Sequence, residues 1–384
     1  MQVFRLALLL AASAMASAQS QLPASPPAPP QSKPVWQIQD SGTTAGLRGI
    51  DSVDGAVAWA SGTGGTVLRT TDGGAHWQKC AVPDADKDGA TLDFRGVQAW
   101  DAKTAIVMAS GPGDKSRLYK TTDGCLTWTL QFVNPDKDGF FDAYVFESLQ
   151  VRSAVGLLLG DPVKGYFPLW RVGIEFDPGY VELLRHRPSA NKNEVAFAAS
   201  NSCLFVYQSF ISFFIATGGE NGSRVFRVVS HGADEISWAT FPSSSVPVGN
   251  HTPSSGIFSL AFAEVPGPPL HDWARRMSGY GVAVGGDYEK PNEALAIAAF
   301  TQDGGEHWIA STHQPHGYRS AVSYDARLKL WITVGTNGSD ISRDDGKTWQ
   351  PLDDGNWNAL SLPFVVGPNG RIARLNEAAL PPAK

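Results

Sequence analysis

The stretch Thr70-Thr71-Asp72-Gly73-Gly74-Ala75-His76-Trp77 decides the fold, because its pattern returns three more times along the chain. The other copies begin at Thr121, Thr301 and Ser342. All four match Ser/Thr-x-Asp-x-Gly-x-x-Trp, except that Cys125 replaces the glycine in the second copy. A motif that recurs at a fixed place in a longer repeated unit is typical of a repeat architecture.

Each residue type in this box has a structural task. The aspartates are expected in a tight turn between two strands, where a short carboxylate accepts backbone N–H bonds. The glycines supply a positive φ, which Cys125 adopts less readily, so we expect the second turn to be distorted. The tryptophans offer large apolar faces for packing between repeats. We therefore interpret the box as structural, with these residues: Asp72, Trp77, Asp123, Trp128, Asp303, Trp308, Asp344 and Trp349.

Seven units of about 47 residues fill residues 47–375. Each unit has an apolar strand, a second strand that ends in glycine, a third strand, a box position and a fourth strand. This pattern predicts an all-β fold, a seven-bladed β-propeller of four-stranded antiparallel blades. Unit seven stops after its third strand, and Val35-Trp36-Gln37-Ile38 is expected to supply the missing strand and close the ring. A pair of β-sandwiches is the rival architecture, but sandwiches do not carry a box at a fixed place in each unit.

The units are not equally regular. Unit three lacks a box across residues 173–187, where the outer edge of its blade is left undefined. Unit four is expected to begin near Glu194 and to end in a degenerate box at Trp238.

The chain is expected to be exported, because residues 1–18 resemble a signal peptide. Arg5 precedes the apolar run Leu6 to Met15, and Ala16-Ser17-Ala18 is a cleavage site. Residues 19–34 hold six prolines and are expected to form a disordered linker. We assign residues 35–378 to the propeller and 379–384 to a tail. No later segment is long and apolar enough to span a bilayer. The expected location is the periplasm or the extracellular space.

Composition excludes several classes of function. The net charge of -6 argues against nonspecific nucleic-acid binding. No dinucleotide fingerprint or phosphate-cradling loop occurs, and no histidine or cysteine spacing suits a metal, so neither a cofactor nor a metal site is predicted. The chain has three cysteines, and whether Cys80 and Cys125 form a disulfide is left open. Asp84, Asp86 and Asp88 imitate the start of a calcium loop, although a solvated turn explains them better. A monomer is expected.

The face opposite the box turns is the expected binding face. Its inner rim is formed by the starts of the first strands, and three arginines and two acids fall there. Arginine forks bind carboxylates and phosphates bidentately. The alternative, which stays open, is that the arginines pair with the acids and only hold the ring together. The rim residues, with Gly256 in unit five, are Arg48, Arg95, Asp142, Glu194, Arg319 and Asn358; weaker candidates in the adjoining loops are Asp161, Glu220, Asp287 and Tyr288.

The boxes resemble the Asp-boxes of bacterial neuraminidase (BNR) repeat propellers. Leu47-Arg48-Gly49, Gly160-Asp161-Pro162 and Tyr318-Arg319-Ser320 make the chain similar to exported seven-bladed propellers of the photosystem II stability and assembly factor family. This resemblance implies a non-enzymatic scaffold that binds a protein or glycan partner through its loop face and channel mouth.

The alternative is a glycoside hydrolase of the sialidase or xyloglucanase type, since enzymes with such repeats exist. It would need an activated nucleophile or paired carboxylates on the rim. The candidates by position are Tyr318, Asp142, Asp161, Glu194 and Asp287, and no arrangement in the sequence selects one of them.

Overall fold

The computed structural model describes residues 34–148, 154–173, 180–207, 212–229, 240–263 and 279–382. The expected signal peptide, most of the expected linker and the degenerate box at Trp238 lie outside the described residues. Within the described ranges, no helix has the length and apolar character needed to cross a bilayer.

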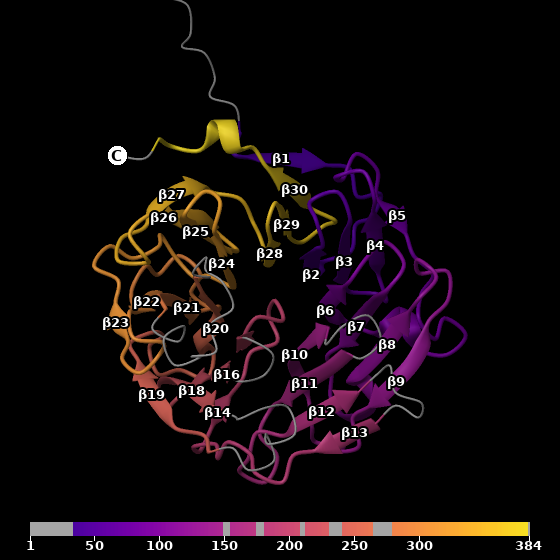
Figure 1. Cartoon of the computed structure of the whole chain (residues 1–384), viewed down its shortest axis with the longest axis horizontal. Coiled ribbons are helices and arrows are strands. Elements are labelled where there is room, and N and C mark those ends of the chain that lie inside the picture. Colours follow the sequence, from indigo (N-terminus) through magenta and orange to yellow (C-terminus); the bar gives the residue numbers. More distant parts are fainter. Residues whose placement is uncertain are drawn as a thin grey trace, which may run out of the picture. The chain divides into compact units, whose positions relative to one another are not determined.

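Seven antiparallel sheets follow one another around a central axis and form the blades of a propeller (Figure 1). The strands of blades one to three are β2 (Leu47–Ser52), β3 (Ala58–Gly62), β4 (Val67–Thr70), β5 (Gln78–Lys79), β6 (Phe94–Ala99), β7 (Ala105–Ala109), β8 (Arg117–Thr121), β9 (Thr129–Val133), β10 (Phe141–Ser148), β11 (Ala154–Gly160), β12 (Leu169–Gly173) and β13 (Tyr180–Leu183).

The strands of blades four to six are β15 (Leu204–Tyr207), β16 (Ser212–Ala216), β18 (Ser223–Val229), β19 (Ser243–Val246), β20 (Ser255–Phe262), β21 (Gly281–Asp287), β22 (Ala298–Thr301), β23 (Ile309–Ala310), β24 (Ala321–Asp325), β25 (Leu330–Gly335), β26 (Gly338–Ser342) and β27 (Gln350–Asp353). Two short strands, β14 (Glu194–Val195) and β17 (Gly218–Gly219), extend the sheet of blade five. Short 3-10 helices are η1 (Gly89–Thr91), η2 (Gly113–Lys115) and η5 (Glu377–Ala379).

The N-terminal strand closes the ring, as predicted. Blade seven consists of β28 (Ala359–Ser361), β29 (Phe364–Val366), β30 (Ile372–Leu375) and, as its outer strand, β1 (Trp36–Gln39). Trp36 pairs with Leu375 and packs its ring 6.1 Å from that of Trp357. This pairing covers the edge of β30, which would otherwise expose unpaired backbone groups.

The start of blade four differs from the prediction. The innermost strand of this blade is β15, and Glu194 belongs to β14, which pairs with β17. In blade three, β13 provides the fourth strand, although residues 174–179 lie outside the described part of the chain.

The box turns are closed by the hydrogen bonds that the sequence predicts. In the first box, Asp72 Oδ1 accepts from the backbone N–H of His76 at 2.9 Å, and Gly74 N–H donates to Thr70 Oγ1 at 2.9 Å. The second box is not distorted, which corrects our expectation. Cys125 has φ +68°, near the +86° of Gly74, and its N–H donates to Thr121 Oγ1 at 3.0 Å.

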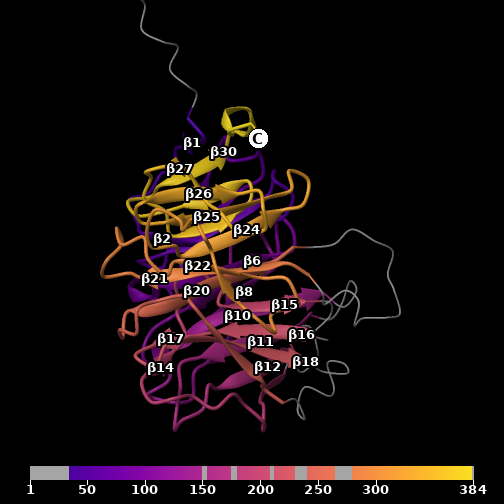
Figure 2. The same cartoon turned by 90° about the vertical axis from the view of Figure 1, so that its left-hand side faces the viewer.

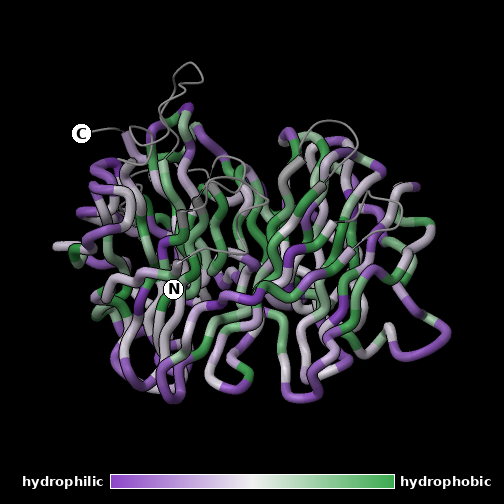
Figure 3. Tube along the Cα trace, turned by 60° about the horizontal axis from the view of Figure 1, so that its bottom comes forward, coloured by the Kyte–Doolittle hydropathy of each residue, from purple (hydrophilic) through white to green (hydrophobic). Residues whose placement is uncertain are grey.

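A disulfide joins Cys80 to Cys125 across 45 residues of chain, with Cα atoms 5.3 Å apart. Cys80 follows the outer strand of blade one, and Cys125 lies in the box turn of blade two, so the bond ties neighbouring blades together. Apolar side chains concentrate in the strands, while hydrophilic residues gather in the turns (Figure 3). The strands run between two loop-bearing faces (Figure 2). The box turns follow the third strands, and the starts of the first strands lie on the opposite face.

Candidate functional site

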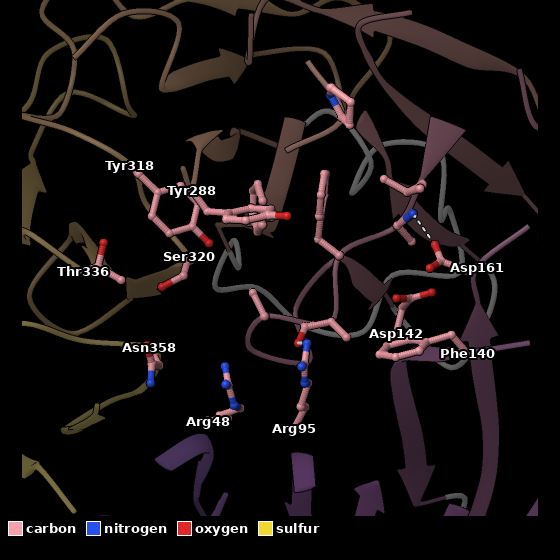
Figure 4. Close-up of a pocket in the computed structure, with 17 residues that line it drawn as sticks. Arg48, Arg95, Phe140, Asp142, Asp161, Tyr288, Tyr318, Ser320, Thr336 and Asn358 are labelled. Carbon is pink, nitrogen blue, oxygen red and sulfur yellow. Dashed lines mark hydrogen bonds between the residues drawn. The ribbon is translucent and has the colours of Figure 1, made fainter. Parts of the chain in front are cut away.

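A cavity of about 580 Å³ lies where the innermost strands begin (Figure 4). In the innermost strands of blades one, two, three and five, the pairing with the second strand shifts by one residue near the start of the strand. Such a β-bulge leaves one residue out of the ladder and re-aims its side chain. The bulged residues all line the cavity, and they are Arg48, Arg95, Asp142 and Phe258.

Blades six and seven contribute the residue at the same position. Gly49 pairs with Ser61 in blade one, as Ala321 pairs with Val334 in blade six and Ala359 with Val366 in blade seven. The residues that precede these first partners are therefore equivalent to Arg48, and in blades six and seven they are Ser320 and Asn358. Both line the cavity. In blade five the position belongs to Phe258, two residues beyond the predicted Gly256.

Arg319 does not line this cavity, which corrects its predicted place on the rim. The prediction was displaced by one residue, and a shift of one residue along a strand moves a side chain to the opposite face. Arg319 is fully buried, and its Nε donates to Asp340 Oδ2 at 2.7 Å. Further bonds run to Asn337 Oδ1 at 2.5 Å and to the Tyr318 carbonyl at 2.7 Å. Arg319 therefore acts as a structural cross-link within blade six.

Glu194 also lies away from the cavity. Its carboxylate accepts hydrogen bonds from Arg224 Nε and Nη2 at 2.7 and 2.6 Å, and from Thr217 Oγ1 at 2.6 Å. Only 4% of the residue is exposed. Its partner is thus Arg224, and not one of the rim arginines considered from the sequence.

Arg48 and Arg95 stand side by side at one wall of the cavity (Figure 4). Asp93, just before β6, accepts a hydrogen bond from Arg95 Nε at 2.9 Å and forms an ion pair with Arg48 Nε at 3.2 Å, which is not aligned as a hydrogen bond. Arg95 also donates to the Ala198 carbonyl at 3.3 Å. Among the described residues, the terminal nitrogens of Arg48 have no hydrogen-bond partner. The pair therefore presents N–H donors that a carboxylate or phosphate can accept.

Two carboxyl groups, Asp142 and Asp161, face each other at another wall (Figure 4). Asp161 Oδ1 accepts from Ala196 N–H at 3.1 Å, whereas the buried Oδ2 of Asp142 has no partner among the described residues. Burial raises the pKa of Asp161 to about 6. Burial, with the nearby Asp161 charge, also raises the pKa of Asp142 well above its ordinary value, while Arg95 opposes the shift.

Aromatic rings form a third wall. Phe258 stacks on Phe197 with ring centres 3.9 Å apart, and Tyr318 meets it edge-on at 4.8 Å. Tyr288, half exposed, stands 6.0 Å from Phe258. Apolar walls with a few convergent polar groups are typical of ligand sites, and the volume falls in the usual range.

Residues 196–202, which we call the crossing segment, follow β14 and contact blades three, five and six, and residues 196–199 of this segment line the cavity. Ser200 Oγ donates to the Ser320 carbonyl of blade six at 2.7 Å, and Asn201 Oδ1 accepts from Tyr144 N–H of blade three at 2.8 Å. Ser202 Oγ donates to Ser259 Oγ of blade five at 2.8 Å. Residues 200–202 also line a second cavity of about 510 Å³ on the far side. The crossing segment therefore separates two cavities.

The remaining candidates lie elsewhere. Glu220 is exposed and accepts from Asn193 Nδ2 at 2.6 Å, and the buried Asp287 accepts from Ser254 Oγ at 2.7 Å. Neither lines the cavity, whereas Asp161 and Tyr288 do. In the calcium-like loop, Asp88 pairs with Arg117.

One group of three possible metal ligands occurs among the described residues, Asp303, Glu306 and His307. It lies in the third box, where Asp303 already accepts hydrogen bonds from the turn.

Of the predicted rim residues, Arg48, Arg95, Asp142 and Asn358 are brought together. Their binding of a ligand stays a prediction. The sequence analysis did not identify Asp93, Phe197 or Phe258 as site residues. Phe258 occupies a β-bulge, and a bulge is recognised from the strand pairing and not from the spacing of residues in the sequence.

The chain is similar to Ycf48 proteins. No family model matches it. Over 129 residues it is 26% identical to "Photosystem II assembly lipoprotein Ycf48" of Synechococcus sp. (strain CC9902), which covers 33% of this chain and 35% of that relative. The match thus spans about a third of the relative's length.

Two solved structures share the fold. "YCF48 bound to D1 peptide" matches with a TM-score of 0.57 and 16% identity over 89% of this chain and 97% of that one. "YCF48 from Cyanidioschyzon merolae" matches with a TM-score of 0.52 and 17% identity over 90% and 99%. The predicted resemblance is confirmed at the level of the seven-bladed propeller.

Proposed function

We propose that this chain, a seven-bladed β-propeller related to the Ycf48 photosystem II assembly factors, is an exported scaffold without enzymatic activity. It binds a segment of a partner protein in the main cavity, the one lined by Arg48 and Arg95. These arginines hold an anionic group of the segment, and the rings around Phe258 hold an apolar side chain beside it.

The observation that carries this proposal is the convergence of one strand position from six blades on a single cavity. Rigid sheets hold these side chains in place, so little ordering is needed when a ligand binds. Asp93 fixes the Nε edges of both arginines and leaves donors directed at the cavity. The similar structure described as bound to the D1 peptide supports a peptide as the ligand class.

The test is a pull-down from the native exported fraction, read by mass spectrometry. The wild type is compared with Arg48→Glu/Arg95→Glu and with the control Lys329→Glu/Arg343→Glu, which makes the same charge change at exposed positions of blade six. We expect a partner that the control retains and the cavity variant loses at least tenfold. Equal recovery by all three proteins, or binding to a glycan array without a protein partner, contradicts the proposal.

A glycoside hydrolase remains the second candidate, and the pair of carboxyls Asp142 and Asp161 favours it. A carboxyl with a raised pKa can serve as the general acid in such enzymes. Burial raises the pKa of Tyr318 far above its ordinary value, which opposes its use as an ionised nucleophile. Turnover of any member of a broad glycoside panel, lost in Asp161→Asn, would favour the hydrolase over the scaffold.

A further inference from the structure

The carboxyl pair in the main cavity has no counter-charge of its own. Asp142 is 1% exposed, it lines the cavity, and its Oδ2 has no hydrogen-bond partner among the described residues. A buried carboxylate oxygen without a partner carries the full cost of desolvation. Asp161 adds a second carboxyl whose only described hydrogen bond comes from Ala196 N–H.

Arg95 does not supply the missing cation. Its Nε is bonded to Asp93, a terminal nitrogen is bonded to the Ala198 carbonyl, and its guanidinium lies 5.7 Å from the ring centre of Phe140. No salt bridge joins it to Asp142 or Asp161 in the described structure. The cavity therefore has two distinct charged walls, one cationic and one acidic.

We propose that Asp142 and Asp161 form a subsite for a primary ammonium group, the side chain of a lysine or the N-terminus of a peptide. An ammonium has three donors, which match the unpartnered Asp142 oxygen and the free acceptor positions of Asp161. The inference deepens the proposed function and rests on it for the statement that the bound molecule is a peptide. That peptide would carry an anionic group at Arg48 and Arg95 and an ammonium at the acidic wall.

The subsite makes binding depend on pH in a defined direction. Because burial raises the pKa values of both carboxyls, a fall in pH protonates the pair more readily than exposed carboxyls, and an ammonium must displace that proton. The other charged or titratable groups that act on the pair are Arg95 from β6 and Cys203, which precedes β15. Burial raises the pKa of the Cys203 thiol, so it stays neutral across this range. Binding of the ammonium should therefore strengthen as the pH rises.

The probe is Nα-acetyl-lysine amide, compared with Nα-acetyl-norleucine amide, which has the same chain without the charge. Binding to the full chain is measured by NMR titration at pH 5 and pH 7.5. We expect the lysine probe to bind at least tenfold more tightly than the norleucine probe at pH 7.5 and to weaken several-fold at pH 5. Asp142→Asn/Asp161→Asn should abolish this preference, while the exposed Asp138→Asn should preserve it.

Three results overturn the inference: equal affinity for both probes, a preference that survives in the double variant, or displacement of the lysine probe by millimolar Ca²⁺ with tighter binding of the metal. A second probe, Nα-acetyl-glutamate amide, tests the arginine wall separately through Arg48→Ala. A glutamate response that is absent in the wild type, or that Arg48→Ala leaves unchanged, refutes the proposed function alone if the lysine response is intact. A glutamate response that Arg48→Ala removes, together with no preference for the lysine probe, refutes only the ammonium subsite.

Discussion

Replacing Asp161 by asparagine should make the protein more stable at high pH and leave its stability at low pH almost unchanged. In the folded protein burial raises the pKa of Asp161 from 3.8 to about 6. Between these values the folded state holds more protons than the unfolded state, so the free energy of unfolding falls as the pH rises. At 1.36 kcal/mol per pH unit, ionising this carboxyl costs the folded protein about 3 kcal/mol above pH 6.

Asparagine removes that cost without removing the acceptor. Its side-chain oxygen can still accept from Ala196 N–H, which Asp161 Oδ1 does at 3.1 Å. The difference in free energy of unfolding between Asp161→Asn and the wild type should therefore increase by about 2.4 kcal/mol from pH 4 to pH 8, because the carboxyl of the unfolded chain is already partly ionised at pH 4. The substitution should also lower the pKa of Asp142, because the charge of Asp161 is one cause of the raised pKa of Asp142.

The assay is urea unfolding at pH 4, 6 and 8 with the disulfide intact, since urea leaves charge interactions unscreened and the midpoints report stability directly. Asp138→Asn, whose side chain is 70% exposed, controls for the loss of one negative charge. If the difference between Asp161→Asn and the wild type is the same at all three pH values, the carboxyl is not desolvated as described, and the argument for the acidic wall fails.

Three further predictions concern the frame that holds the cavity. Arg319→Met removes the two guanidinium contacts of the buried Asp340 and leaves it only His316 as an ionisable partner, so it should lower the free energy of unfolding by about 3–5 kcal/mol, as measured with urea; a loss below about 1 kcal/mol would contradict the cross-link. Cys80→Ser/Cys125→Ser opens a 45-residue connection and should cost about 4 kcal/mol, checked by unfolding with and without a reductant. Trp36→Ala should cost about 3–5 kcal/mol in the same assay, because this side chain is 4% exposed in the ring-closing strand; an unchanged midpoint would refute its role in closure.

The sequence was sufficient for the architecture because the boxes mark the same turn in four blades. The strands, the glycine after the second strand and the box after the third recur in a fixed order. The number of blades, and the outer strand that Trp36 supplies to the seventh, could therefore be predicted from the sequence. The positions of Arg48, Arg95 and Asn358 were also predicted correctly. Each of them directly precedes the residue at which regular pairing of the innermost strand begins.

The errors arise where local sequence looks alike but pairing differs. Tyr318-Arg319-Ser320 imitates Leu47-Arg48-Gly49, yet Ala321, not Ser320, pairs at the position of Gly49, which puts Ser320 at the cavity and Arg319 in the core. Glu194 looks like the start of a first strand because the apolar run Val195-Ala196-Phe197 follows it. Glu194-Val195 forms β14, whose partner is β17, and the crossing segment separates β14 from the first strand of blade four, β15. Strand pairing decides both cases, within blade six for Ser320 and with β17 for Glu194, and the local sequence does not encode the register.

The closing strand also sets an order of events during synthesis. Trp36 Nε1 donates to Ser339 Oγ across a separation of 303 residues, and among the strands of the described ranges β1 pairs only with β30. Blades one to six can pair their strands as soon as each hairpin has left the ribosome. The first strand to emerge must wait for the last. Until β1 and β30 pair, the apolar Trp36 and the edge of β30 are exposed to other chains. The closure between these two strands is therefore the slowest step in the assembly of the ring, and the step at which chaperones bind or copies of the chain mispair most readily.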